Sequence, residues 1–232
     1  MISVLKRPRP AITNKPVSPL AAAAARVSIV CALLFVVLLG SLHVSEPEFD
    51  PSWRFVSEYA LGHIGWMMHV AFLTLALSLA GAVVAISSQV RTVLGYVGLA
   101  LLGLAAVGIL IAAVFTTDPQ MASRGTAATL SGRLHVLGAS LDYTPIAALL
   151  LSFSLARNQA WRPIRKWLYV TAGITLVALA AFMLSLPYDG HVGPSVRAGL
   201  FGRFLLISYM GWLLTVGVQA IRLHKDRADH GD

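Results

Sequence analysis

Ionisable side chains are few in this chain, and several carboxylates and imidazoles recur at intervals typical of one helical face. Two sets share a spacing of four, three and four residues, which brings side chains to the same side of an α-helix. They are Glu58, Gly62, Gly65 and His69, and Ser131, His135, Gly138 and Asp142. Carboxylates and imidazoles on facing helices can pair, exchange a proton, hold a metal ion or bind a polar ligand.

Membrane-spanning helices are the elements that must position these side chains. Of the 232 residues, 57% are hydrophobic and 12% are charged, which is about half the charged fraction of a soluble domain. A bilayer core about 30 Å thick needs roughly 20 apolar residues of helix, and six runs approach or exceed this length. They are Val27–Val44, Ala60–Ser87, Val93–Phe115, Leu134–Ala156, Trp167–Leu186 and Ala198–Ile221.

We therefore predict an all-α fold, a polytopic membrane bundle of six transmembrane helices over residues 26–222. A basic, proline-rich and unstructured tail is expected at 1–25, and a second tail at 223–232. The first span is long for a signal-peptide core and no A-x-A cleavage site follows it, so we expect it to be retained. The single cysteine, Cys31, excludes an internal disulfide and a cysteine-based metal site.

The basic residues indicate the orientation of the spans, because Lys and Arg gather on the cytoplasmic side of membrane proteins. With the N-terminus inside, that side holds Lys6, Arg7, Arg9, Lys15, Arg26, Arg91, Arg157, Arg162, Arg165, Lys166, Arg222, Lys225 and Arg227. The outer side holds Arg54, Arg124, Arg133, Arg197 and Arg203. We expect a plasma (inner) membrane protein with both termini cytoplasmic. The net charge of +8 then reflects topology and contact with membrane lipids, and no nucleic-acid partner is expected.

Most of the remaining ionisable residues fall at the predicted outer side. Glu58 and His135 would each lie about one turn below the outer surface, close enough to meet, and Arg203 of the last span could join them. Asp118 follows the third span in an Asp-Pro turn and could fold back onto Arg203 or His135, whereas Asp189 is expected in a solvated turn. An arginine in such a cluster suits a phosphate or carboxylate ligand.

A deeper pair is expected from the same two sets. At 1.5 Å per residue, His69 and Asp142 would each lie about 16 Å beyond the first member of their set, near the middle of the membrane. A carboxylate there costs about 2.5–3.5 kcal/mol on insertion scales, so His69 is its expected partner. The alternative is that both stripes only form a seam along which two helices pack. Pro145 predicts a break in the fourth span just after Asp142.

A group of short motifs resembles a known family of membrane proteins. The motifs are Ser57-Glu58-Tyr59-Ala60-Leu61-Gly62, Gly65-Trp66, Phe115-Thr116-Thr117-Asp118-Pro119, Gly132-Arg133-Leu134-His135, Pro145-Ile146-Ala147 and Gly202-Arg203. In this order they are similar to the six-pass DUF998 family (domain of unknown function) of bacteria and archaea, over roughly residues 27–222. Family members often have Phe-Pro-x-Asp at the Asp118 motif, and Gln or Glu where this chain has Gly202. The resemblance implies fold and membrane location but no activity.

A binding pocket is the first functional interpretation. A lipid or another amphiphile would enter near the outer leaflet, with glycine-rich walls along its chain. The polar end of the pocket would be Ser57, Glu58, Asp118, His135 and Arg203, the positions that the family resemblance also marks. The alternative is a non-catalytic subunit or sensor of a membrane complex, with another membrane protein or a second copy as its partner. In that case the polar stripes only order the bundle.

An intramembrane, metal-dependent hydrolase is a further alternative, similar in kind to ceramidase-like proteins. His135, Asp118 and His63 would hold zinc, and Ser57 or Glu58 would handle the water.

Haem b is the last alternative, with His63 or His69 facing His135 at like depth. Histidines in membrane bundles usually have simpler roles than haem ligation, and no H-x-x-x-H pair is present for zinc. Neither a metal site nor a cofactor is therefore predicted.

Overall fold

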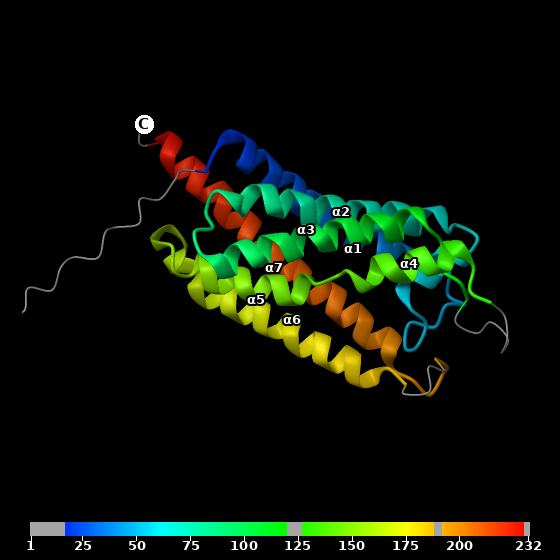
Figure 1. Ribbon diagram of the computed structural model, residues 1–232. Coiled ribbons are helices and arrows are strands. Elements are labelled where there is room, and N and C mark those ends of the chain that lie inside the picture. Colours follow the sequence, from blue (N-terminus) through cyan, green and yellow to red (C-terminus); the bar gives the residue numbers. More distant parts are fainter. Residues whose placement is uncertain (1–16, 120–126, 188–191, 230–232) are drawn as a thin grey trace, which may run out of the picture.

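Helices make up all the regular structure in the part of the chain that the computed structural model describes, residues 17–119, 127–187 and 192–229. The long helices run side by side in one bundle (Figure 1). The elements, with η for a 3-10 helix, are α1 (Pro19–Ser45), η1 (Val56–Leu61), α2 (Trp66–Ser87), α3 (Val93–Val114), α4 (Leu130–Ser140), α5 (Thr144–Leu155), η2 (Gln159–Ile164), α6 (Arg165–Ser185) and α7 (Ala198–Asp229).

Six segments of this bundle are long and apolar enough to cross a membrane. They are Pro19–Ser45, Trp66–Ser87, Val93–Val114, Leu130–Leu155, Gln159–Ser185 and Ala198–Asp226. Large apolar side chains such as Val37, Val107 and Val177 are exposed on their outer surface, as expected of helices that face lipid tails. The prediction of an all-α, multi-pass membrane protein is confirmed.

The first helix begins earlier than expected. The Ser18 side-chain oxygen accepts a hydrogen bond from the backbone N–H of Ala21 (3.1 Å), and Pro19 occupies the first turn, where its missing N–H has no intrahelical partner to lose. The prediction of an unstructured tail is therefore wrong for residues 19–25, which are helical. The basic residues of 1–16 lie outside the described residues. At the other end, α7 continues to Asp229, through most of the predicted second tail.

The fourth span is broken into two helices. α4 ends at Ser140 and α5 begins at Thr144, with Pro145 in its first turn. Proline has no N–H to continue the hydrogen bonding of α4, and the Asp142 carboxylate accepts the N–H of Thr144 instead (3.2 Å). The predicted break is confirmed. In Figure 1, α4 lies beside α3, whereas α5 packs against both α3 and α6.

The entry into the second span differs from the prediction of an α-helix from residue 60. Residues 56–61 form the 3-10 helix η1, a turn follows, and α2 begins only at Trp66. The stripe from Glu58 to His69 is therefore not one α-helical face.

Glu46, at the end of α1, holds this entry in place. It is buried, and its Oε1 accepts the backbone N–H of Ile64 (2.6 Å). Its Oε2 occupies the space that a side chain at Gly62 would fill. Only glycine at position 62 lets the carboxylate reach the turn before α2.

Two glycines allow α3 and α4 to pack closely against each other. The backbone oxygen of Gly138 lies where a side chain on Gly108 would begin, and a Cβ on Gly138 would lie 2.5 Å from the Gly108 oxygen and 2.9 Å from the nitrogen of Ala112. Small residues permit such contact between membrane helices. α4 is thereby fixed against α3 and not against α6 or α7.

Candidate functional site

Arg203 is the centre of a buried polar network at the end of the bundle where α1 joins η1. It projects from the second turn of α7 and is 8% exposed. Its Nε donates to Nε2 of His43 (2.7 Å), and its Nη1 donates to the backbone oxygens of Arg54 (2.6 Å) and Gly199 (3.1 Å). Its Nη2 donates to the Tyr59 hydroxyl (3.4 Å). All three guanidinium nitrogens are thus engaged by protein groups.

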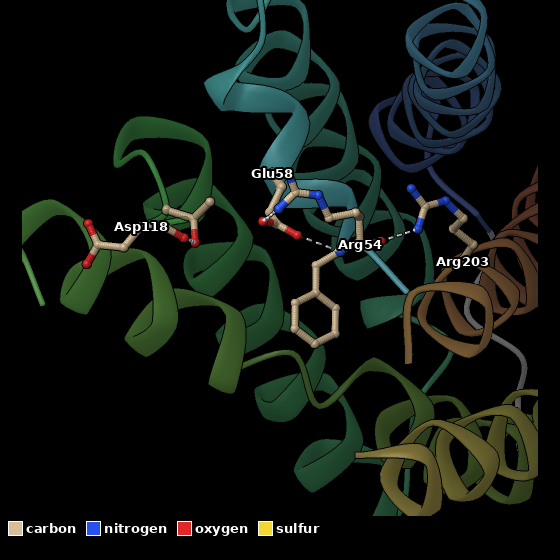
Figure 2. A network of polar contacts seen from close by, with 6 residues as sticks. Arg54, Glu58, Asp118 and Arg203 are labelled. Atoms are coloured by element: carbon tan, nitrogen blue, oxygen red, sulfur yellow. Dashed lines mark hydrogen bonds and ion pairs between the residues drawn. The ribbon is translucent and has the colours of Figure 1, made fainter. Parts of the chain in front are cut away.

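Glu58 is fully buried and forms an ion pair with Arg54. Its Oε1 accepts Nη1 of Arg54 at 2.7 Å, and its Oε2 accepts the backbone N–H of Phe55 at 3.2 Å. Figure 2 shows Glu58 turned toward Arg54, with Arg203 on the far side of the Arg54 backbone. Arg54 therefore joins the two residues, because its side chain binds the carboxylate and its carbonyl accepts from Arg203.

Asp118 binds Thr129, the N-cap residue of α4, and does not join this network. Its Oδ2 accepts the backbone N–H of Thr129 (2.9 Å) and its Oδ1 accepts the Thr129 hydroxyl (2.7 Å). A side chain at Gly132 would collide with the carboxylate. Figure 2 shows Asp118 well apart from Arg203. The expected contact with Arg203 or His135 is therefore wrong, because the start of α4 attracts and binds the anion.

His135 lies on α4 with its ring against the end of α3, and it forms no hydrogen bond or ion pair with Glu58. Its Nδ1 lies 3.1 Å from the backbone oxygen of Ala112 and 2.8 Å from that of Phe115. Both are acceptors, so Nδ1 carries the hydrogen. The ring contacts Phe72 edge to face, with 5.9 Å between ring centres.

His69 and Asp142, the expected deep pair, have different partners. The Nδ1 of His69 lies 2.7 Å from the backbone oxygen of Ala113, and its Nε2 lies 3.4 Å from the Thr116 hydroxyl. Asp142 accepts the hydroxyl of Tyr209 on α7 (3.2 Å).

The two residues do not meet because the chain from Glu58 to His69 is not one continuous helix. Since α2 begins at Trp66, His69 lies one turn inside its span, while Asp142 lies at the break within its own.

A cavity of about 500 Å³ lies between α4 and α5 on one side and α6 and α7 on the other. This volume is within the range of small-molecule sites. Its walls are mainly apolar, and Phe72, Ile109, Leu179, Phe182 and Leu206 contribute to them. The polar residues in its lining are Ser57 of η1, Thr117 after α3, His135 and Ser140 of α4, and Asp142 and Tyr143 at the helix break.

Five of the predicted site residues lie in two places, and Asp118 and His69 lie in neither. Ser57, His135 and Asp142 line the cavity. Glu58 and Arg203 belong to the buried network.

Three residues of the network were missed by sequence reasoning. Arg54 carried a signal, since it lies four residues before Glu58, the spacing of an ion pair on one helical face, and Tyr59 belongs to the Ser-Glu-Tyr motif. His43 gave no signal, because nothing near the end of the first span indicates that its ring meets the last helix.

Metal binding finds no support in the described residues. No group of three or more His, Cys, Asp or Glu side chains within the described ranges could hold a metal ion. His63 is exposed, His135 donates to backbone oxygens at the end of α3, and Asp118 binds Thr129. The ligand set expected for a hydrolase is therefore not assembled. Asp189 lies outside the described residues.

Fold and site together define a six-span membrane protein with a buried polar network at one end and an apolar cavity beside it. The chain belongs to the family described as Protein of unknown function (DUF998), which matches residues 29–219. The predicted resemblance is thus confirmed. No curated protein and no solved structure matches the chain.

Proposed function

We propose that the protein binds a lipid or another amphiphile in the cavity between α4–α5 and α6–α7. The observation that carries this proposal is an apolar cavity of about 500 Å³ within membrane-spanning helices, with a carboxylate in its wall. An apolar wall accepts a hydrocarbon chain, and a few polar groups orient the ligand.

Asp142 is the group best suited to hold the polar part of the ligand. Its Oδ2 accepts one hydrogen bond from Tyr209 and its Oδ1 one from Thr144. Each carboxylate oxygen can accept a second bond, so a hydroxyl or amine of the ligand has an acceptor in the cavity wall. Ionisable residues within membrane spans usually mark functional sites. Asp142 replaces the Glu58–Arg203 cluster in this role, since that cluster is occupied by protein groups.

The packing of the helices supports entry from the side. α4 is fixed to α3 by the Gly108–Gly138 contact, and the cavity separates it from α6 and α7. A ligand in the surrounding lipid can therefore approach between α4 and α6 without crossing the polar network.

The distribution of Lys and Arg supports a location of the cavity in the outer leaflet. The cavity lies toward the η1 end of the bundle, opposite the end where α1 begins and α7 finishes (Figure 1). That second end carries an excess of Lys and Arg, as cytoplasmic ends do. We therefore assign both termini to the cytoplasm and the cavity to the outer half of a plasma membrane.

Native mass spectrometry of the protein purified in mild detergent tests the proposal. Wild type should carry an additional mass of a lipid or amphiphile. The variant Gly202→Leu should lose it, because Gly202 lines the cavity and a Cβ there already lies 3.3 Å from the Phe182 ring. Gly211→Leu on the same helix is the matched control, since nothing lies within 4 Å of its Cβ position.

Two further measurements separate loss of the ligand from loss of structure and test the role of Asp142. Thermal unfolding should show both leucine variants folded, so that loss of the ligand is not loss of structure. Asp142→Asn should reduce retention of amine or hydroxyl ligands while keeping the cavity shape. An unchanged bound mass in Gly202→Leu, or no bound mass in wild type, would overturn the proposal.

A further inference from the structure

A second recess lies at the other end of the bundle, between the start of α6 and the last turns of α7. It is a groove of about 280 Å³, lined by residues that include Ile164, Trp167, Leu214, Val218, Gln219 and Arg222. It shares no lining residue with the cavity between α4–α5 and α6–α7, called the amphiphile cavity below. Its role is therefore independent of the proposed function.

The groove combines an apolar floor with a charged rim. Leu214 and Val218 lie one turn apart on α7, and the exposed Trp167 ring borders them. Arg222 lies one turn further along α7, eight residues or about 12 Å from Leu214 at 1.5 Å per residue. The groove therefore changes from apolar to cationic along the helix axis, as the membrane does from its core to its headgroups.

The surface around the groove is strongly basic. The exposed cations at this end are Arg26, Arg91, Arg157, Arg162, Arg165, Lys166, Arg222 and Lys225. Among the side chains that the structure describes there, Asp226 is the acidic one. In the described part of the chain, Arg222 forms no hydrogen bond or ion pair with another residue. Its guanidinium is available to an anion from outside the protein.

We infer that this groove binds an anionic glycerophospholipid of the adjacent membrane leaflet. Arg222 binds the headgroup phosphate, for which a guanidinium has two parallel donors. One acyl chain lies along Val218 and Leu214, and Trp167 contacts the region between headgroup and chain, where tryptophan is enriched. Gln219 holds the groove wall in place, because its Nε2 donates to the backbone oxygen of Ala160 in η2 (2.9 Å).

The test compares phosphatidylglycerol with phosphatidylcholine, titrated into the purified full-length protein and followed by native mass spectrometry. Wild type should bind phosphatidylglycerol more tightly. Arg222→Gln should weaken that binding about fivefold, which corresponds to about 1 kcal/mol for one basic residue near a membrane surface. Arg91→Gln is the control: it removes the same charge from the connection between α2 and α3, outside the groove, and should leave the affinity unchanged.

A second pair of variants tests the shape of the groove. Val218→Trp fills it and should weaken binding of phosphatidylglycerol, whereas Ile207→Trp, on an exposed part of α7 outside both recesses, should not. Equal effects of Arg222→Gln and Arg91→Gln would overturn the inference, because binding would then follow total charge. Equal affinity of wild type for the two lipids would also overturn it.

Discussion

Arg203 donates its Nε–H to Nε2 of His43 at 2.7 Å, and the other ring nitrogen, Nδ1, lies 2.6 Å from the backbone oxygen of Leu39. Arginine can only donate, so Nε2 is the acceptor and Nδ1 carries the single hydrogen of a neutral imidazole. This bond joins α1 to α7, which lie at opposite ends of the sequence and pack against each other in the bundle.

Replacing His43 with Leu should destabilise the protein, because buried Arg203 loses an acceptor. A hydrogen bond to a charged group contributes about 1.5–3 kcal/mol. His43→Gln should retain most of the stability, since its amide oxygen can accept from Arg203. Thermal unfolding in detergent, followed by circular dichroism, measures the difference. Equal unfolding temperatures for the two variants would contradict the assigned bond.

Glu58→Gln should lower the free energy of unfolding more than the same change at a surface carboxylate does. It removes the charge that Arg54 faces at 2.7 Å. Breaking a buried ion pair costs about 3–5 kcal/mol, and the lower end applies because the Arg54 side chain is 20% exposed. Glu48→Gln, at an exposed position, is the control. In a double-mutant cycle, the variant with both Glu58→Gln and Arg54→Gln should lose less free energy of unfolding than the two single variants lose in sum.

The contact between α3 and α4 predicts opposite results for two glycine-to-alanine changes. Gly138→Ala places a methyl group against the α3 backbone and should destabilise by about 1–3 kcal/mol, as overpacking does. Gly103→Ala, on α3 with nothing within 4 Å of its Cβ position, should be neutral or stabilise by about 0.4–1 kcal/mol. Unfolding temperatures in the same detergent distinguish the two, and a stabilised Gly138→Ala would show that the helices are further apart.

Reporter fusions test the assigned orientation. Green fluorescent protein fused after residue 232 should fluoresce in cells, because it folds in the cytoplasm. Alkaline phosphatase fused within the connection between α3 and α4 should be active, because that enzyme requires the outer compartment. The reverse pattern would place the amphiphile cavity in the inner leaflet and the Arg222 groove in the outer one.

The six spans and the break at Pro145 could be predicted because they depend on local properties. Apolar length identifies a span, and a missing N–H interrupts a helix whatever its neighbours. Both signals are contained in about 20 consecutive residues.

The polar contacts could not be predicted, because they depend on where a span begins and on which loop residue folds over it. Because α2 begins only at Trp66, His69 does not lie at the depth of Asp142. Arg54, in the connection between α1 and η1, forms the ion pair with Glu58 that had been expected of His135. Asp118 found its partner in Thr129, since the start of a helix offers unpaired N–H groups.

The division of the fourth span has a consequence for how relatives of this protein can diverge. The side chains of residues 130–140 must pack against α3, whereas those of residues 144–155 must pack against both α3 and α6. Substitutions on the cavity side of the first half, at Val136 or Ala139, can thus reshape the recess while the second half keeps its fit. One membrane crossing can accordingly evolve as two units, one tuned to whatever occupies the recess and the other to the integrity of the bundle.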